Sequence, residues 1–172
     1  MTPENFRIAF RQLAAGVSVV TFWRDGCLHG FTATSVTSVS LSPPLALFCV
    51  GRQNRSYAHL RVGTPIGISI LSADQQHLSD RFAAKAGSQG YDDIETLEYA
   101  ARAPLIAGAI SHLEGTVAML IPAGDHVVVL CDLAEARTHT CSQPLLYWRR
   151  GYHAIAPLSV GQDSPECAGA KA

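Results

Sequence analysis

The chain has 172 residues, of which 48% are hydrophobic and 16% charged, and its formal net charge is -1. This size and composition fit one domain with a single hydrophobic core and leave no room for a second independent domain. Because the 13 basic and 14 acidic residues form no blocks of one sign, neither a nucleic-acid surface nor a polybasic membrane patch is expected.

The apolar runs and the N-terminus argue against a membrane or secreted protein. Val17–Trp23 and Leu45–Val50 are too short to cross a bilayer. Residues 1–5 lack the basic start and the apolar stretch of a signal peptide. We therefore expect a cytoplasmic protein without a membrane partner.

The cysteines and histidines give no metal pattern. The five cysteines are an odd number and include no Cys-x-x-Cys pair, which argues against a disulfide framework and against a thiolate metal site. His112 and Glu114 could share one face of a strand, but such a pair is more often an exposed polar couple. We predict reduced, structural cysteines and no metal ion.

A short helix and a hairpin are predicted at the start of the chain. Thr2 is a cap residue before a proline at the first helical position, and apolar residues follow at helical spacing up to Gly16. From Val17 to Trp23 the composition changes to β-branched and aromatic residues. The turn at residues 24–26 and a second extended run from Cys27 then predict a β-hairpin.

Further short strands are predicted along the rest of the chain. They are Leu45–Val50, Pro65–Leu71, Gly115–Ile121, Val127–Leu133, Leu146–Trp148 and Tyr152–Ile155. A capping box at Ser72–Gln75 predicts a second helix, with Leu78 and Phe82 on one face, up to Gly87. Residues 88–102 fit a loop or a helical turn equally well.

Many short strands with two or three inserted helices predict a mainly β fold, a closed or partly closed antiparallel barrel. We assign residues 1–156 to this domain. Residues 157–172 are rich in Ser, Gly, Ala and Pro without periodicity, so we expect a largely disordered tail.

The segment from Gly30 to Leu45 is the most informative for function. Its hydroxyl residues alternate with small and apolar ones and end in a double proline. Such a lining suits a planar, largely apolar ring with a polar rim and a phosphate tail. From composition alone, an ordinary Thr/Ser-rich edge strand is the more common explanation.

The segment resembles the signature of flavin reductases that serve two-component monooxygenases. The matching runs occur in the order of that family and cover roughly residues 5 to 155. They are Phe6-Arg7, Gly16–Thr21, Gly30–Ser35, Pro43–Leu45, Ile70–Ser72, Arg81–Ala83, Gly124–His126 and Pro144–Tyr152.

The resemblance implies the FMN-binding split β-barrel, usually a homodimer with flavin sites near the subunit interface. It implies reduction of FMN or FAD by NADH or NADPH, with hydride transfer to flavin N5 and release of reduced flavin to a partner monooxygenase. A non-catalytic flavin-binding or carrier barrel is the alternative. An oxidase-like relative with bound FMN fits the ordered motifs less well.

The same resemblance assigns residues to the flavin. The ring would lie against Thr32, Ala33, Thr34 and Ser35, and the ribityl chain beside Ser38, Val39 and Ser40. The turn from Cys49 and Val50 to Asn54, Arg55 and Ser56 would bind the phosphate, although Asn54 or Ser56 could simply cap a surface helix. Arg81, Phe82 and Ala83 would also lie near the cofactor, although Phe82 could be core packing and Arg81 a solvated charge.

His126 is the candidate catalytic residue. In the family the histidine of the Gly-Asp-His turn lies by the nicotinamide, where an imidazole could donate to the carboxamide or supply a proton. Asp125 would orient the turn, and Tyr152 would form a wall of the same pocket. Any hairpin can carry a Gly-Asp turn, so a structural role remains open. Ser69 stands where the family often has Asn, which leaves the choice between FMN and FAD undecided.

Overall fold

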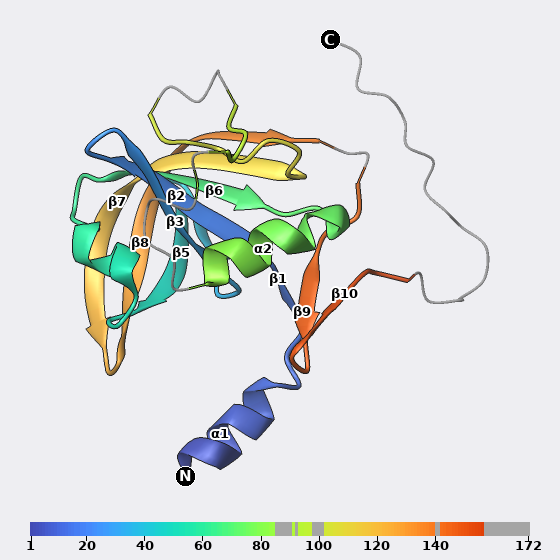
Figure 1. Ribbon diagram of the computed structural model, residues 1–172. Coiled ribbons are helices and arrows are strands. Elements are labelled where there is room, and N and C mark those ends of the chain that lie inside the picture. The colour runs from blue at the N-terminus through green and yellow to red at the C-terminus, as the bar shows by residue number, and fades with distance from the viewer. Residues whose placement is uncertain (85–90, 92, 98–101, 140–141, 157–172) are drawn as a thin grey trace.

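The computed structural model describes residues 1–84, 91, 93–97, 102–139 and 142–156 (Figure 1). The tail from residue 157, predicted to be disordered, lies outside the described residues. None of the helices in the described part of the chain is long and apolar enough to cross a membrane.

The first helix, α1 (Pro3–Phe10), is shorter than predicted and projects from the body of the molecule (Figure 1). Thr2 caps it as expected, because the Thr2 hydroxyl accepts a hydrogen bond from the Asn5 N–H at 3.2 Å. The apolar face of α1 buries no residue. The chain then enters strand β1 (Ala15–Gly16), which pairs with β9 near the C-terminus, so the helix ends before Gly16.

The predicted hairpin is confirmed as strands β2 (Ser18–Arg24) and β3 (Cys27–Ala33). Asp25 and Gly26 both have positive φ, 52° and 77°, as a two-residue hairpin turn requires. Strand β2 is buried on both faces, because Val20 lies in one apolar cluster and Val19 in another. This explains why the sequence of β2 is continuously apolar instead of alternating.

Seven antiparallel strands form the main sheet, in the order β3-β2-β6-β7-β8-β5-β4. The further strands are β4 (Thr37–Leu41), β5 (Pro44–Gly51), β6 (Pro65–Ile70), β7 (Ser111–Ala123) and β8 (His126–Thr138). The sheet curls around the main core, so that Phe31 on β3 meets Phe48 on β5 with ring centroids 5.7 Å apart. The end strands β3 and β4 are not paired with each other among the described residues, and the barrel is therefore only partly closed.

The inserted helices lie outside this sheet (Figure 1). They are the 3₁₀ helices η1 (Arg55–His59) and η2 (Ala73–Gln75) and the helix α2 (Gln76–Ala83). The predicted capping box is confirmed, with Ser72 and Gln75 bonding each other's backbone N–H. Strands β9 (Leu146–Trp148) and β10 (Gly151–His153) join β1 in a small second sheet.

Polar side chains hold residues 102–110 against the outer face of the main sheet. The Ser69 hydroxyl accepts from the Ile106 N–H at 3.0 Å, and His112 Nε2 donates to the Ile106 carbonyl at 2.7 Å. The described residues between 91 and 102 form turns and one isolated bridge, from Thr96 to Ile106. The loop alternative is therefore correct for this part of the chain.

Candidate active site

A cavity of about 410 Å³ lies where the end of β3, helix α2 and the β9–β10 hairpin meet. Polar side chains from all three regions line it, namely Thr32, Thr34, Ser79, Asp80, Arg150 and Tyr152. These residues are far apart in the sequence. Thr32, Thr34 and Tyr152 are three of the residues predicted from the resemblance, and the fold brings them to one place.

A chain of hydrogen bonds ties the three walls of this cavity together. The Thr32 hydroxyl donates to the Ser79 carbonyl at 2.6 Å. The Tyr152 hydroxyl donates to Asp80 Oδ1 at 2.9 Å, and the same hydroxyl lies 2.9 Å from Ser79 Oγ. Burial raises the pKa of Tyr152, so its hydroxyl keeps its proton at neutral pH. The walls are thereby fixed before any ligand binds.

A second cavity of about 350 Å³ adjoins the first, since Ala83 lines both. Its walls come from β3, the turn before η1, and the end of α2. Asn54 Oδ1 accepts from the Ser56 N–H at 2.9 Å, and the Ser56 hydroxyl donates to the Gly30 carbonyl at 3.1 Å. Asn54 is therefore the cap of η1, and the backbone donor of Ser56 is already used. Arg55 is exposed and lines the cavity as a positive charge.

The three residues of the Arg81–Ala83 run point in different directions, because successive helix residues are about 100° apart. Phe82 is buried, stacks on Tyr91 with centroids 4.3 Å apart, and lines the second cavity. Arg81 instead forms a two-bond ion pair with Asp93 at a separate cavity, and this pair lowers the pKa of Asp93 to about 2. Phe82 therefore belongs to the hydrophobic core and also forms part of the wall of the second cavity. Arg81 is paired with the Asp93 carboxylate.

The turn between β7 and β8 carries the Gly-Asp-His run at an exposed tip. His126 Nδ1 donates to Asp125 Oδ1 at 2.8 Å, and this bond lowers the pKa of Asp125. The Asp125 carbonyl accepts a hydrogen bond from the Arg52 N–H at 2.9 Å. This bond holds the turn beside Arg52, which directly precedes residues 53–56 in the wall of the second cavity. The His126 side chain is half exposed and lines neither cavity.

The remaining predicted residues are not in the walls of these two cavities. Ser38, Val39 and Ser40 lie on the edge strand β4, where the Ser40 hydroxyl accepts from the Ser42 N–H at 3.2 Å. Ala33 and Val50 are buried in the main core, which leaves only their backbone groups for a ligand. The Ser35 hydroxyl accepts from the Cys49 N–H at 2.9 Å. Their roles in flavin binding stay predictions.

The sequence reasoning did not find Ser79, Asp80, Tyr147 or Arg150. Ser79 and Asp80 lie one helical turn before Ala83, so helical spacing from the Arg81–Ala83 run could have identified them. Tyr147 and Arg150 lie inside a run that was quoted for the resemblance, but no role had been given to them. All four line the first cavity.

The comparisons with known proteins cover almost the whole described chain. Residues 10–156 match the model of the flavin reductase like domain. An NADH:FMN oxidoreductase of Rhodococcus qingshengii is 35% identical over 158 residues, which are 90% of this chain and 82% of the relative. The reductase subunit HsaB of a flavin-dependent monooxygenase of Rhodococcus jostii is 28% identical over 155 residues, 90% of this chain and 79% of the relative.

A solved structure has the same fold. The NADH:FAD oxidoreductase of Streptomyces globisporus superposes with a TM-score of 0.83 at 33% identity, over 91% of this chain and 97% of that protein. The split-barrel prediction is therefore confirmed, with a sheet that is not fully closed. On the family model and on these relatives, the chain belongs to the flavin reductase like domain family.

Proposed function

We propose that this protein reduces FMN or FAD with NADH or NADPH and passes the reduced flavin to a partner monooxygenase. The observation that carries the proposal is the cavity where Thr32, Thr34 and Tyr152 meet, in a chain of a flavin reductase family. The relatives are named as reductases, which favours an enzyme over the non-catalytic flavin carrier.

The residues present fit a flavin. The two adjoining cavities have the size of ordinary ligand sites, and their walls combine aromatic surface with hydroxyl and amide groups. Bound flavin would supply the chemistry, since its ring accepts a hydride at N5 from reduced nicotinamide. Thr32 and Thr34 would bind the polar rim of the ring. Arg150 would stabilise the negative charge that develops on it.

Arg55 and the predicted residues around it would hold the phosphate of FMN. Arg55 lines the second cavity and is exposed, so its guanidinium can approach a phosphate with two parallel hydrogen bonds. Phe82 forms the apolar wall opposite. Arg81 would reach the phosphate only by leaving Asp93.

His126 would act on the nicotinamide. Its Nδ1 proton is held by the Asp125 carboxylate, which orients the ring and leaves Nε2 as the nitrogen that can reach a ligand. Nε2 lies next to Gly51 in the neighbouring strand. Because glycine has no side chain, Gly51 does not block the approach of a ligand to Nε2. We propose that His126 positions the carboxamide of the donor from this turn.

We also propose a homodimer formed through the outer face of strands β5, β7 and β8. Side chains from the three strands form two apolar rows there, Met119-Leu130-Leu47 and Ile121-Val128-Cys49. Met119 is 51% exposed and Ile121 is 43% exposed, and exposed apolar rows of this kind mark association surfaces. The double variant Met119→Lys/Ile121→Lys should be monomeric in analytical ultracentrifugation. An unchanged dimer mass would show that the dimer does not form through this face.

We also propose that the enzyme acts in the cytoplasm, together with its nucleotide substrates and the monooxygenase.

The first experiment mixes the purified protein with FMN or FAD and with NADH or NADPH under anaerobic conditions. Loss of reduced-nicotinamide absorbance, together with bleaching of the flavin, is the expected result. Absence of flavin-dependent oxidation with every combination would refute the reductase activity. Comparison of the four combinations gives the preferred flavin and donor.

The role of His126 is tested with His126→Ala, using His77→Ala on the exposed side of α2 as the matched control. We expect a KM for the nicotinamide donor that rises roughly tenfold, with a smaller change in flavin binding measured by fluorescence quenching. Equal loss of both would mean that the histidine only supports the fold of the turn.

A further inference from the structure

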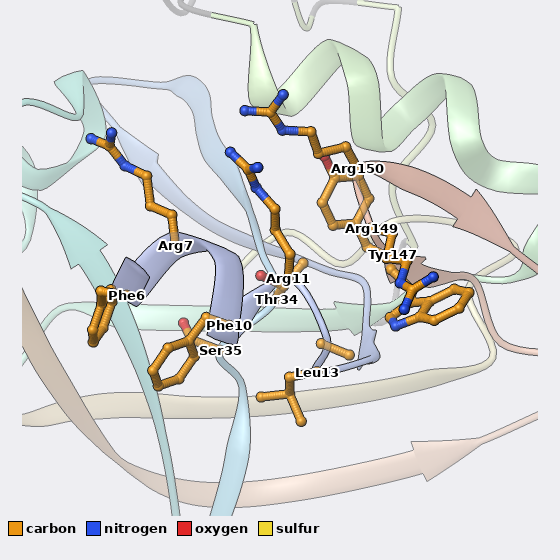
Figure 2. Close-up of a pocket in the computed structure, with 12 residues that line it drawn as sticks. Phe6, Arg7, Phe10, Arg11, Leu13, Thr34, Ser35, Tyr147, Arg149 and Arg150 are labelled. Atoms are coloured by element: carbon orange, nitrogen blue, oxygen red, sulfur yellow. The ribbon is translucent and has the colours of Figure 1, made fainter. Parts of the chain in front are cut away.

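A third cavity, of about 500 Å³, lies between α1 and the β9–β10 turn (Figure 2). No residue of α1 was assigned a role above. Four arginines line this cavity, Arg7 from the helix, Arg11 directly after its end, and Arg149 and Arg150 from the turn. So many guanidinium groups around one hollow indicate a multiply charged anion as the ligand.

One arginine holds the helix in place. Arg149 donates two hydrogen bonds to Gln12 Oε1, at 3.0 and 2.6 Å, and its guanidinium lies 4.5 Å from the ring centroid of Trp148. Trp148 Nε1 in turn donates to the Gln12 carbonyl at 3.2 Å. These contacts fix the end of α1 beside the β9–β10 turn, so the two sides of the cavity are held at a defined separation.

The other three arginines keep their charge available. Arg7 and Arg11 share one carboxylate, Glu4, at 3.9 Å each, a distance at which exposed ion pairs are weak. Arg150 has no carboxylate within ion-pair distance in the part of the chain that the structure describes. Figure 2 shows the guanidinium groups of Arg7, Arg11 and Arg150 on the same side of the cavity.

The opposite side of the cavity is apolar and aromatic. Phe6 and Phe10 stack on each other with ring centroids 4.5 Å apart, and each is at least half exposed. In Figure 2 they lie with Leu13 away from the guanidinium groups. Exposed aromatic rings of this kind provide a stacking surface for a nucleotide base.

The third cavity is continuous with the proposed flavin site. Thr34, Tyr147 and Arg150 line both the third cavity and the cavity of Thr32 and Tyr152. A ligand with its reactive ring in the first cavity can therefore place a pyrophosphate and a second base in the third. The ligand that fits is elongated, with charge in the middle and a planar group at the far end.

We propose that this third cavity binds the adenosine diphosphate part of a dinucleotide substrate. Arg7 and Arg11 would bind the pyrophosphate, Arg150 would lie between it and the reactive ring, and the Phe6–Phe10 pair would stack on the adenine. FAD and the nicotinamide dinucleotides share this chemistry, whereas FMN lacks it. The inference rests on the proposed function, because it places the remainder of a substrate whose reactive ring lies in the first cavity.

The test titrates the full chain with ADP and follows the heat of binding. The double variant Arg7→Gln/Arg11→Gln should bind ADP at least about tenfold more weakly, as the loss of charge-assisted hydrogen bonds requires. Arg24→Gln, at an exposed ion pair in the β2–β3 turn, is the matched control and should bind ADP like the unmodified protein. Because the side chains of Arg7 and Arg11 form only the two weak ion pairs with Glu4 among the described residues, the double variant should melt at nearly the same temperature.

Two kinetic comparisons identify which dinucleotide uses the cavity. If the flavin does, the ratio of the KM for FAD to the KM for FMN rises at least about tenfold in the double variant. If the donor does, the ratio of the KM for NADH to that for reduced nicotinamide mononucleotide rises instead. Absence of ADP binding to the unmodified protein, or equal binding by all three proteins, would overturn the inference. Lack of reductase activity with every combination of flavin and donor would refute the proposed function alone, since the ADP titration needs no turnover.

Discussion

The Tyr152 hydroxyl donates to the Asp80 carboxylate at 2.9 Å and so joins strand β10 to helix α2 across the candidate active site. In Tyr152→Phe this bond and the contact with Ser79 are lost. We expect the free energy of unfolding to fall by about 1 kcal/mol and the KM for flavin to rise roughly threefold.

Urea unfolding and steady-state kinetics measure both effects. Tyr147→Phe is the matched control, because Tyr147 lines the same cavity but its hydroxyl forms no hydrogen bond to the described residues. If the two variants behave alike, the bond to Asp80 does not position the cavity wall.

The absence of a side chain at Gly30 lets Phe82 pack against β3. A Cβ at Gly30 would lie 2.8 Å from Phe82 Cε1 and 2.8 Å from the Val20 carbonyl oxygen. Because the carbonyl belongs to the neighbouring strand, it cannot move aside easily, and overpacking of this kind costs about 1–3 kcal/mol. Gly30→Ala should therefore unfold at lower urea concentration and bind flavin more weakly. Gly16→Ala, where a Cβ meets nothing within 4 Å, should change neither quantity, and a normal Gly30→Ala protein would contradict the close packing.

His112 makes the stability of the fold depend on pH. Burial lowers the pKa of His112 below its ordinary value of 6.5, although its bond to the Ile106 carbonyl partly opposes this. Above pH 6.5 the imidazole is neutral in both the folded and the unfolded chain. As the pH falls below 6.5, the unfolded chain takes up a proton before the folded one does, so the folded state loses stability.

Urea unfolding at pH 8 and at pH 5 measures this dependence. His112→Gln, which keeps a donor for the Ile106 carbonyl, should lose less stability between the two pH values than the unmodified protein. Some dependence should remain, since burial also lowers the pKa of His29. His77→Gln on the protein surface should keep the full dependence. Identical pH profiles for all three proteins would show that His112 does not titrate differently on folding.

Cys131 should be chemically inert in the folded protein. It lies in the main core, and burial raises the pKa of its thiol to about 12, so the reactive thiolate is almost absent at pH 8. Cys27 is exposed. Treatment with iodoacetamide followed by peptide mapping should find Cys27 alkylated and Cys131 unmodified until urea is added. Modification of Cys131 at the rate of Cys27 would mean that the core opens on the time scale of the reaction.

Local patterns in the sequence determined the elements that frame the site. The Asp25-Gly26 turn follows from the positive φ that this hairpin demands, and the Ser72–Gln75 capping box from donors within one turn. The resemblance to the family further predicted Thr32 and Thr34 beside the flavin and Tyr152 in the wall of the nicotinamide pocket, and all three line one cavity. Such signals depend on neighbours a few residues away, which is why they can be read without the fold.

Only the tertiary structure decided which of these side chains share a cavity. Thr32 bonds a residue 47 positions away, and Tyr152 lies against one 73 positions away, and no local pattern encodes contacts of that range. The structure likewise pairs Arg81 with Asp93, makes Asn54 a helix cap, and brings Arg7 and Arg11 into one cavity with Arg150. The physical reason is that a side chain's partner depends on how distant segments pack. The sequence alone therefore identified the family and part of the candidate active site, but not the arginine cavity beside it.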